Sequence, residues 1–273
     1  MLYIFVMHSI NILIFSLYRY FPKRSNEPSS SSSIEEPSSS SSEPSSSSES
    51  LCADFVEGEV RDTRYNYIKK NFCDERDGKK YFYVEIGEQT WMAENLNYNV
   101  EGRECLDDCE RYGRLYDWST AMGFPERCNG SPQANCLNLT LEYKDVCPDG
   151  WHIPGYDDWA ELLHFVSKDI NKFSCGDNPS DTPINCSGLG QYLTARSNGS
   201  SNDYDKYGFS ALLDGNSYNG DAWWSAKEFQ PNRAFYMGIR QDGVVFLTYN
   251  QNMNMNINKT NPLHVRCLKD NDD

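Results

Sequence analysis

The chain has 273 residues, 40 acidic and 25 basic side chains, a net charge of −15 and ten cysteines. Because residues 25–50 are almost entirely Ser, Glu and Pro, about 220 residues can fold, enough for one domain with a sizeable core. The acidic balance excludes a general nucleic-acid binder, since contacts to phosphate backbones need clustered Lys and Arg. Ten cysteines indicate an oxidising, extracytoplasmic compartment.

Residues 1–24 form an apolar N-terminal segment, a candidate anchor or signal. Residues 1–18 have about the minimum length of a membrane span and are a candidate membrane tether. The positive charges Arg19, Lys23 and Arg24 follow the apolar run, which would keep the downstream chain cytoplasmic. That orientation contradicts the cysteine content. A degenerate anchor, a mis-assigned start, a membrane segment with unusual flanks and a buried or disordered tail therefore all stay open.

Residues 25–50 are predicted to be a disordered linker. The unit EPSSSSS begins at residues 27 and 36, and EPSSSS begins at residue 43. These units have almost no apolar surface to offset the entropy cost of ordering. Their prolines stiffen the chain and their glutamates repel one another, which favours a spacer between an anchor and a folded domain over low-complexity sequence without a role.

Residues 51–273 are predicted to form a single disulfide-rich α+β domain of short antiparallel strands with one or two helices. One hairpin joins KYFYVEI (80–86) to QTWM (89–92). A second joins 234–239 to 244–249, where Asp242 and Gly243 would supply the positive dihedrals of a tight primed turn. The last strand is predicted over LHVRCL at 263–268, and residues 250–258 fit an edge strand or a loop.

The main helix is predicted to follow Pro154. Its apolar face would comprise Trp159, Leu162, Leu163 and Val166. Acidic residues in its first turns would be stabilised by the helix dipole; these are Asp157, Asp158 and Glu161. A shorter helix is predicted within residues 115–122.

The ten cysteines are predicted to form disulfides. None belongs to a CxxC pair, so no metal site is predicted. Proximity along the chain suggests the pairs Cys52–Cys73, Cys105–Cys109, Cys128–Cys136 and Cys175–Cys186. By elimination, Cys147 would pair with Cys267 and close the largest loop, which gives the largest entropic stabilisation.

Six segments carry a resemblance to a known family: GEQTWMAENLNY (87–98), YGRLYDW (112–118), CPDGWHIP (147–154), GFSAL (208–212), Trp224-Ser225 and VRCLKD (265–270). Over about residues 76–270 the chain resembles the Fibrobacter succinogenes major paralogous domain. The resemblance implies a duplicated domain of bacterial surface and secreted proteins, without an established activity and related to the C-type lectin and formylglycine-generating enzyme folds. Gly155 stands where the family usually has a helix-capping Ser, and the usual lipoprotein cysteine is missing.

Enzyme signatures are absent from the sequence. There is no GxSxG, HExxH, GxxxxGK[ST] or dinucleotide fingerprint, so no enzyme activity and no cofactor are predicted. His152, within CPDGWHIP, is the only histidine in a motif that could be organised. A buried histidine hydrogen-bonded to the backbone is the favoured interpretation over a catalytic base.

Two short segments are candidate binding sites of a lectin-like fold. Gln230 and Asn232 belong to a QPN triplet that resembles calcium- and sugar-binding motifs of C-type lectins, although an ordinary turn is the favoured interpretation. Trp223 and Trp224 would point to opposite faces of a strand. One of them would then belong either to an exposed sugar-stacking platform or to a second packing layer.

The sequence therefore predicts a non-catalytic domain displayed on or outside a bacterial cell envelope. Its expected role is adhesion, or binding to polysaccharide or a cell-surface protein. One alternative is a formylglycine-generating-enzyme-like oxidase whose reactive cysteine performs copper-dependent oxidation, which would require unpaired thiols. The other is a purely structural surface protein.

Overall fold

The computed structural model describes residues 50–100, 108–130, 136, 144–171, 175, 184–195, 204–213, 220–248 and 257–271. These residues belong to one compact unit, Ser48–Asp273. The apolar segment predicted at 1–24, the linker predicted at 25–50 apart from Ser50, and most of the 250–258 tract lie outside the described residues. No helix of the described part of the chain is both long and apolar enough to cross a membrane.

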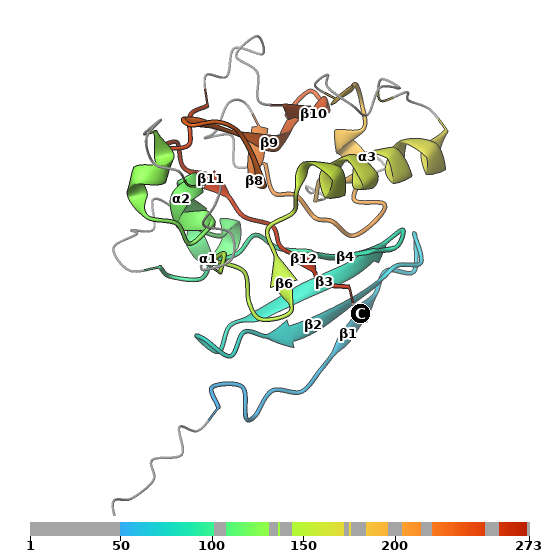
Figure 1. Cartoon of the computed structure of the whole chain (residues 1–273). Helices are drawn as coiled ribbons and strands as arrows, with labels where there is room; N and C mark the ends of the chain where they lie inside the picture. The colour runs from blue at the N-terminus through green and yellow to red at the C-terminus, as the bar shows by residue number, and fades with distance from the viewer. Residues whose placement is uncertain are drawn as a thin grey trace, which may run out of the picture. The chain divides into compact units, whose positions relative to one another are not determined.

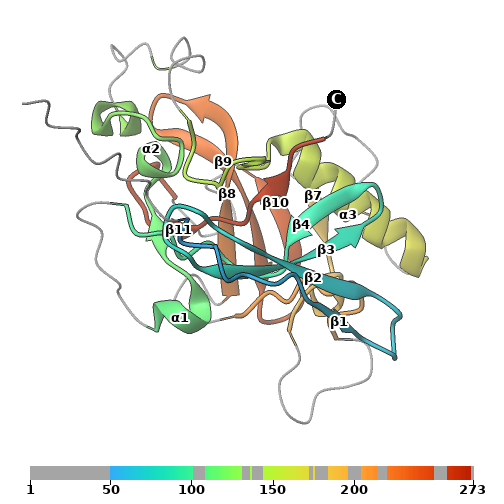
Figure 2. The ribbon, with the colours of Figure 1, turned by 90° about the horizontal axis from the view of Figure 1, so that it is seen from below.

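The domain is built on two six-stranded sheets, which confirms the predicted α+β class. Sheet A consists, in spatial order, of β1 (Glu59–Arg61), β2 (Ile68–Cys73), β3 (Lys80–Ile86), β4 (Gln89–Met92), β12 (Leu268–Lys269) and β6 (Trp151–His152). Sheet B consists of β5 (Leu115–Tyr116), β11 (Leu263–His264), β8 (Gly220–Gln230), β9 (Arg233–Arg240), β10 (Val245–Thr248) and β7 (Ile184–Cys186). Figures 1 and 2 together show strands β2–β4 of sheet A stacked below sheet B.

Both predicted hairpins are confirmed. β3 and β4 pair antiparallel across Gly87, whose φ of 66° is in the left-handed region that favours glycine. β9 and β10 also pair antiparallel, but the predicted turn type is wrong because only Gly243, not Asp242, has positive φ. The Gly243 N–H donates to the Arg240 carbonyl at 2.9 Å, as in a type I turn followed by a glycine bulge.

The predicted main helix is confirmed as α3 (Tyr156–Ile170). Its N-cap is Gly155, which has no side chain to accept a hydrogen bond. The Asp158 carboxylate instead accepts a bond from the Gly155 N–H at 2.7 Å, the half of a capping box that does not need a Ser. Trp159 and Leu162 are fully buried on the apolar face, and the helix contacts β8, β9 and β10 of sheet B.

The helix predicted within residues 115–122 is only partly present. Its first residues form β5, and a single turn, α2 (Trp118–Ala121), follows. Asp117 separates the two because its extended backbone and its side chain, which accepts from the Thr120 N–H at 3.0 Å, make it the N-cap. Among the described residues, further short helical turns include α1 (Cys109–Tyr112) and the 3-10 turns Glu126–Asn129 and Gly190–Tyr192.

The prediction of one strand over residues 263–268 is wrong. β11 pairs with β5 and β8 in sheet B, whereas β12 pairs with β4 and β6 in sheet A. Between them the Val265 carbonyl accepts a hydrogen bond from the Leu96 N–H at 2.9 Å, so the backbone is satisfied outside either ladder. The segment is the connection by which the chain passes from one sheet to the other (Figure 1).

Two groups of buried side chains form the core, and both draw residues from the two sheets. The α2 core contains Tyr81, Tyr116, Trp118, Trp224 and Val265, among others. The α3 core contains Val84, Trp91, Trp159, Trp223 and Met237, among others. Adjacent residues of β8 therefore belong to different cores, because successive strand residues point to opposite faces.

Four of the predicted disulfides are confirmed: Cys52–Cys73, Cys128–Cys136, Cys147–Cys267 and Cys175–Cys186. Of the fifth predicted pair, Cys105 lies outside the described residues, while Cys109 is disulfide-bonded. Every cysteine that the structure describes is thus oxidised. This state is typical of proteins that fold in an oxidising, extracytoplasmic compartment.

Candidate functional site

The adjacent tryptophans Trp223 and Trp224 do not form a sugar-stacking platform. Both are 0% exposed, and each indole N–H is satisfied internally. Trp223 Nε1 donates to Asn95 Oδ1, and Trp224 Nε1 donates to the Tyr116 carbonyl, both at 2.7 Å. The alternative of a second packing layer is the correct one, since both faces of β8 are covered.

The QPN triplet lies in the turn between β8 and β9. Gln230 ends β8, and the exposed Asn232 uses its carbonyl to accept from the Lys259 N–H at 3.0 Å. An ordinary turn explains these residues. No group of three or more His, Cys, Asp or Glu side chains that could hold a metal ion occurs among the described residues. The structure therefore does not bring Gln230 and Asn232 into one surface with the buried Trp223 and Trp224.

His152 is neither buried nor bonded to the backbone, so that prediction is wrong. Its side chain is 39% exposed, with Nδ1 2.5 Å from Asp270 Oδ1 and Nε2 3.9 Å from Asp158 Oδ2. The nearby Asp158 carboxylate and the hydrogen-bonded Asp270 carboxylate raise the His152 pKa to about 9, against the opposing effect of burial. The imidazolium thus links the start of α3 to the residue that follows β12.

We expect His152 to make stability depend on pH in the alkaline range. Because its pKa is raised from 6.5 to about 9 on folding, its contribution is fully present below pH 6.5 and is lost as the pH rises through about 9. Between pH 7 and pH 10, urea denaturation should therefore show a larger loss of unfolding free energy for the native chain than for His152→Gln. Equal losses, or an NMR titration of His152 near 6.5, would contradict this expectation.

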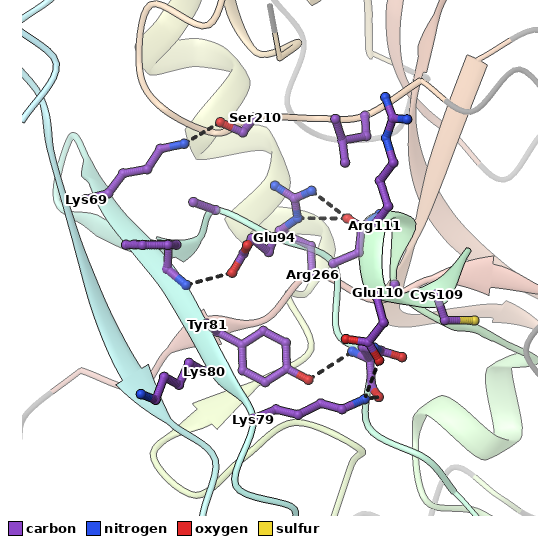
Figure 3. Close-up of a pocket in the computed structure, with 16 residues that line it drawn as sticks. Lys69, Lys79, Lys80, Tyr81, Glu94, Cys109, Glu110, Arg111, Ser210 and Arg266 are labelled. Atoms are coloured by element: carbon purple, nitrogen blue, oxygen red, sulfur yellow. Dashed lines mark hydrogen bonds and ion pairs between the residues drawn. The ribbon is translucent and has the colours of Figure 1, made fainter. Parts of the chain in front are cut away.

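A polar pocket of about 280 Å³ lies between sheet A and the loop formed by residues 204–213. Residues of β2, β3 and α1 line the pocket. The segment that follows β4, the loop that contains Ser210, and Arg266, which lies between β11 and β12, complete the lining. Figure 3 shows Arg266 in the middle, with Lys69 and Ser210 on one side and Lys79 and Glu110 on the other.

Arg266 is the most deeply buried charge of the pocket, at 1% exposure. Its Nε and Nη2 donate to Asn95 Oδ1 at 3.0 and 2.5 Å, and Nη1 donates to the Phe209 carbonyl. The guanidinium also lies over the Phe209 ring, 4.4 Å from its centroid. Burial lowers the Arg266 pKa to about 10, with partial compensation from the more distant Asp221, Glu94 and Asp205. The side chain stays positively charged at neutral pH.

On one side of the pocket, Lys69 is held by the loop that contains Ser210. Lys69 Nζ donates to Ser210 Oγ at 2.5 Å and lies 4.0 Å from Asp205 Oδ2. Ser210 has a φ of 56°, which is unfavourable for a residue other than glycine. Asp205 fixes this conformation by accepting from both the Ser210 N–H at 2.8 Å and its hydroxyl at 2.6 Å.

On the opposite side, hydrogen bonds fix the rim. Lys79 Nζ donates to the Asn97 carbonyl at 2.8 Å and lies 3.7 Å from Glu110 Oε1. Asn97 Nδ2 donates to the same glutamate oxygen at 3.1 Å, and the Tyr81 hydroxyl accepts from the Asn97 N–H at 3.1 Å. The pocket is therefore a preformed array of hydrogen-bonding groups rather than an apolar cavity.

A second hollow of about 480 Å³ adjoins the pocket. The two hollows share Arg111 and Leu212, and the second is bordered by Tyr112 and Tyr204. Aromatic rings beside hydrogen-bonding groups suit ligands that carry both apolar faces and polar edges. Because the two hollows share lining residues, a chain-like ligand bound in one could extend into the other.

A family model, the Fibrobacter succinogenes major domain, matches residues 84–269, more than half of the chain. The chain belongs to this family. The Fibrobacter succinogenes major domain thus runs from Val84, within β3, to Lys269 at the end of β12, and β1, β2 and the first part of β3 precede the match. No curated protein and no solved structure matches the chain. The relation to C-type lectins and the formylglycine-generating enzyme therefore stays a prediction.

Four of the six segments that carry the family resemblance line the pocket of this Fibrobacter succinogenes major domain. The segment 87–98 contributes Asn95 and three neighbours, 112–118 contributes Gly113, 208–212 contributes Ser210 and Leu212, and 265–270 contributes Arg266. Sequence reasoning missed this site because its residues come from distant segments. The signal that the sequence offered was Arg266, a charge flanked by the apolar Val265 and Cys267.

Proposed function

We propose that the chain is a non-catalytic binding domain that holds a polysaccharide or a cell-surface protein in the pocket around Arg266. The observation that carries this proposal is the convergence of four family segments on one preformed polar pocket. Its side chains are held by hydrogen bonds before any ligand arrives, which lowers the entropic cost of binding.

The hydrogen bonding of the pocket carboxylates favours binding over catalysis. Glu94 Oε2 accepts from the Phe82 N–H at 2.8 Å, and Glu110 accepts from Asn97. Both acidic groups thus serve to hold the pocket wall. The oxidation of the described cysteines likewise weighs against an oxidase that needs a reactive thiol.

An extracytoplasmic location is part of the proposal. Disulfides in the folded unit fit secretion or display on the cell envelope. The Ser, Glu and Pro composition of residues 25–50 fits a spacer that would hold the domain away from the surface that carries it.

Binding is tested with the whole chain on cellulose, xylan and a glycan array. We expect the oxidised chain to bind at least one polysaccharide and the same chain to lose binding after reduction and alkylation, which removes the disulfide-stabilised fold. Absence of binding to every polysaccharide would exclude the carbohydrate part of the proposal. Equal binding before and after reduction would show that the folded pocket is not needed.

A further inference from the structure

The pocket has the opposite charge balance to the chain as a whole. Its lining contains three lysines and two arginines, but only two glutamates. The whole chain has 40 acidic and 25 basic residues and a net charge of −15. Long-range electrostatics therefore oppose the approach of an anion, so any binding of an anion must depend on the local arrangement of cations.

The deepest cation of the pocket has only neutral partners in direct contact. The hydrogen-bond acceptors of Arg266 are an amide oxygen of Asn95 and the backbone carbonyl of Phe209. Three of its five N–H groups make these bonds, which leaves two. No carboxylate bonds directly to Arg266, and the more distant Asp221, Glu94 and Asp205 offset its charge only in part, so Arg266 contributes positive charge to the floor of the pocket.

A second cation, Lys69, lines the same pocket and is held by the loop that contains Ser210. Lys69 is largely buried, with a side chain 18% exposed, and burial lowers its pKa. The positive φ of Ser210, which holds Lys69, is the kind of local strain found at ligand sites. Asp205 lies 4.0 Å away, at the limit of an ion pair, so it only partly offsets the ammonium charge.

We propose that the pocket binds an oxyanion carried on a polysaccharide, either the carboxylate of a uronic acid or a sulfate ester. Lys69 and Arg266 would supply the positive charge, and the neighbouring sugar unit would occupy the adjoining hollow beside Tyr112 and Tyr204. This inference rests on the proposed binding function and names its ligand class. Charge-assisted hydrogen bonds to such groups are stronger than those to neutral hydroxyls.

The test uses two matched pairs of polymers and the whole chain. Polygalacturonate is compared with its fully methyl-esterified form, and dextran sulfate with dextran, by isothermal titration calorimetry. We expect binding to the charged member of at least one pair, and which pair responds identifies carboxylate or sulfate. Binding to neutral members alone would overturn this inference and leave the proposed function standing. Absence of binding to all four polymers, cellulose and xylan would overturn this inference together with the carbohydrate part of the proposed function.

Lys69→Gln and Lys70→Gln form a matched pair of variants that locates the site. The two lysines are adjacent on β2 and so point to opposite faces; Lys70 lies outside the pocket, 3.7 Å from Glu85. Loss of one charge-assisted contact should weaken binding about tenfold in Lys69→Gln. Lys70→Gln should change it less than about twofold, as expected for an exposed charge. Equal weakening in both variants would mean non-specific attraction and would overturn the assignment.

Discussion

Removal of the Cys147–Cys267 disulfide should destabilise the domain more than removal of Cys52–Cys73, Cys128–Cys136 or Cys175–Cys186. The bond spans 120 residues. In the chain-entropy model, a loop of that length restricts the unfolded chain by about 5 kcal/mol. We therefore expect the double variant Cys147→Ala/Cys267→Ala to lose about that much unfolding free energy in guanidinium denaturation.

Cys128→Ala/Cys136→Ala is the control for loop length. This disulfide spans 8 residues, and its cysteines are buried like Cys147 and Cys267, so truncation to Ala leaves comparable cavities. The same model gives a loss of about 2.5 kcal/mol for the short loop. Equal losses in the two double variants would show that the long loop does not set the stabilisation.

Truncation of Asn95 should cost nearly as much as the loss of the long disulfide. Asn95 Oδ1 accepts three hydrogen bonds, from Trp223 Nε1 and from Nε and Nη2 of Arg266, and its Nδ2 donates to the Tyr112 carbonyl at 2.8 Å. Asn95→Ala leaves three buried N–H groups without this acceptor, two of them on a charged group. We expect a loss of about 4 kcal/mol in the free energy of unfolding.

Two further variants separate the role of Asn95 from general damage to the pocket. Asn97→Ala truncates the same residue type two positions away, where Nδ2 makes one bond, to Glu110, and should cost about 1 kcal/mol. Asn95→Asp keeps an accepting oxygen beside Arg266 but loses the Nδ2 donor to the Tyr112 carbonyl, so it should cost clearly less than Asn95→Ala without matching the native chain. An Asn95→Ala variant as stable as Asn97→Ala would show that the network around Arg266 contributes little.

Features governed by nearby residues were predictable from the sequence. The β3–β4 hairpin follows from seven alternating residues and a glycine turn, and α3 from four apolar residues at helical spacing. Three disulfides of short span follow from proximity. Once these and the predicted Cys105–Cys109 pair were assigned, the cysteines left over gave the long Cys147–Cys267 link correctly.

Features that depend on what covers a surface were not predictable. Strand periodicity placed Trp223 and Trp224 on opposite faces, which the two cores confirm, but it contains no information on whether the second face meets water or another layer. The same limit explains LHVRCL. Its alternate residues Leu263, Val265 and Cys267 all lie in the α2 core, as in a single strand, although the segment begins in sheet B and ends in sheet A.

The pocket could not be found from local patterns. Lys69 and its partner Ser210 are separated by 141 residues, and Asn95 and its partner Arg266 by 171. No fixed spacing links such residues, because their contact is created by the stacking of the sheets and the crossing of residues 263–268 between them. The family segments were recognisable one at a time, whereas their meeting point required the fold.

The Cys52–Cys73 disulfide has a mechanical consequence. Cys52 precedes β1, the short strand at the edge of sheet A, and Cys73 ends β2. A pulling force along the chain before Cys52 therefore passes through the covalent bond directly to Cys73. Residues 53–72 carry none of that load, so tension cannot peel β1 from the edge of the sheet. The force instead reaches the domain at the paired ends of β2 and β3, where Cys73 lies opposite Lys80.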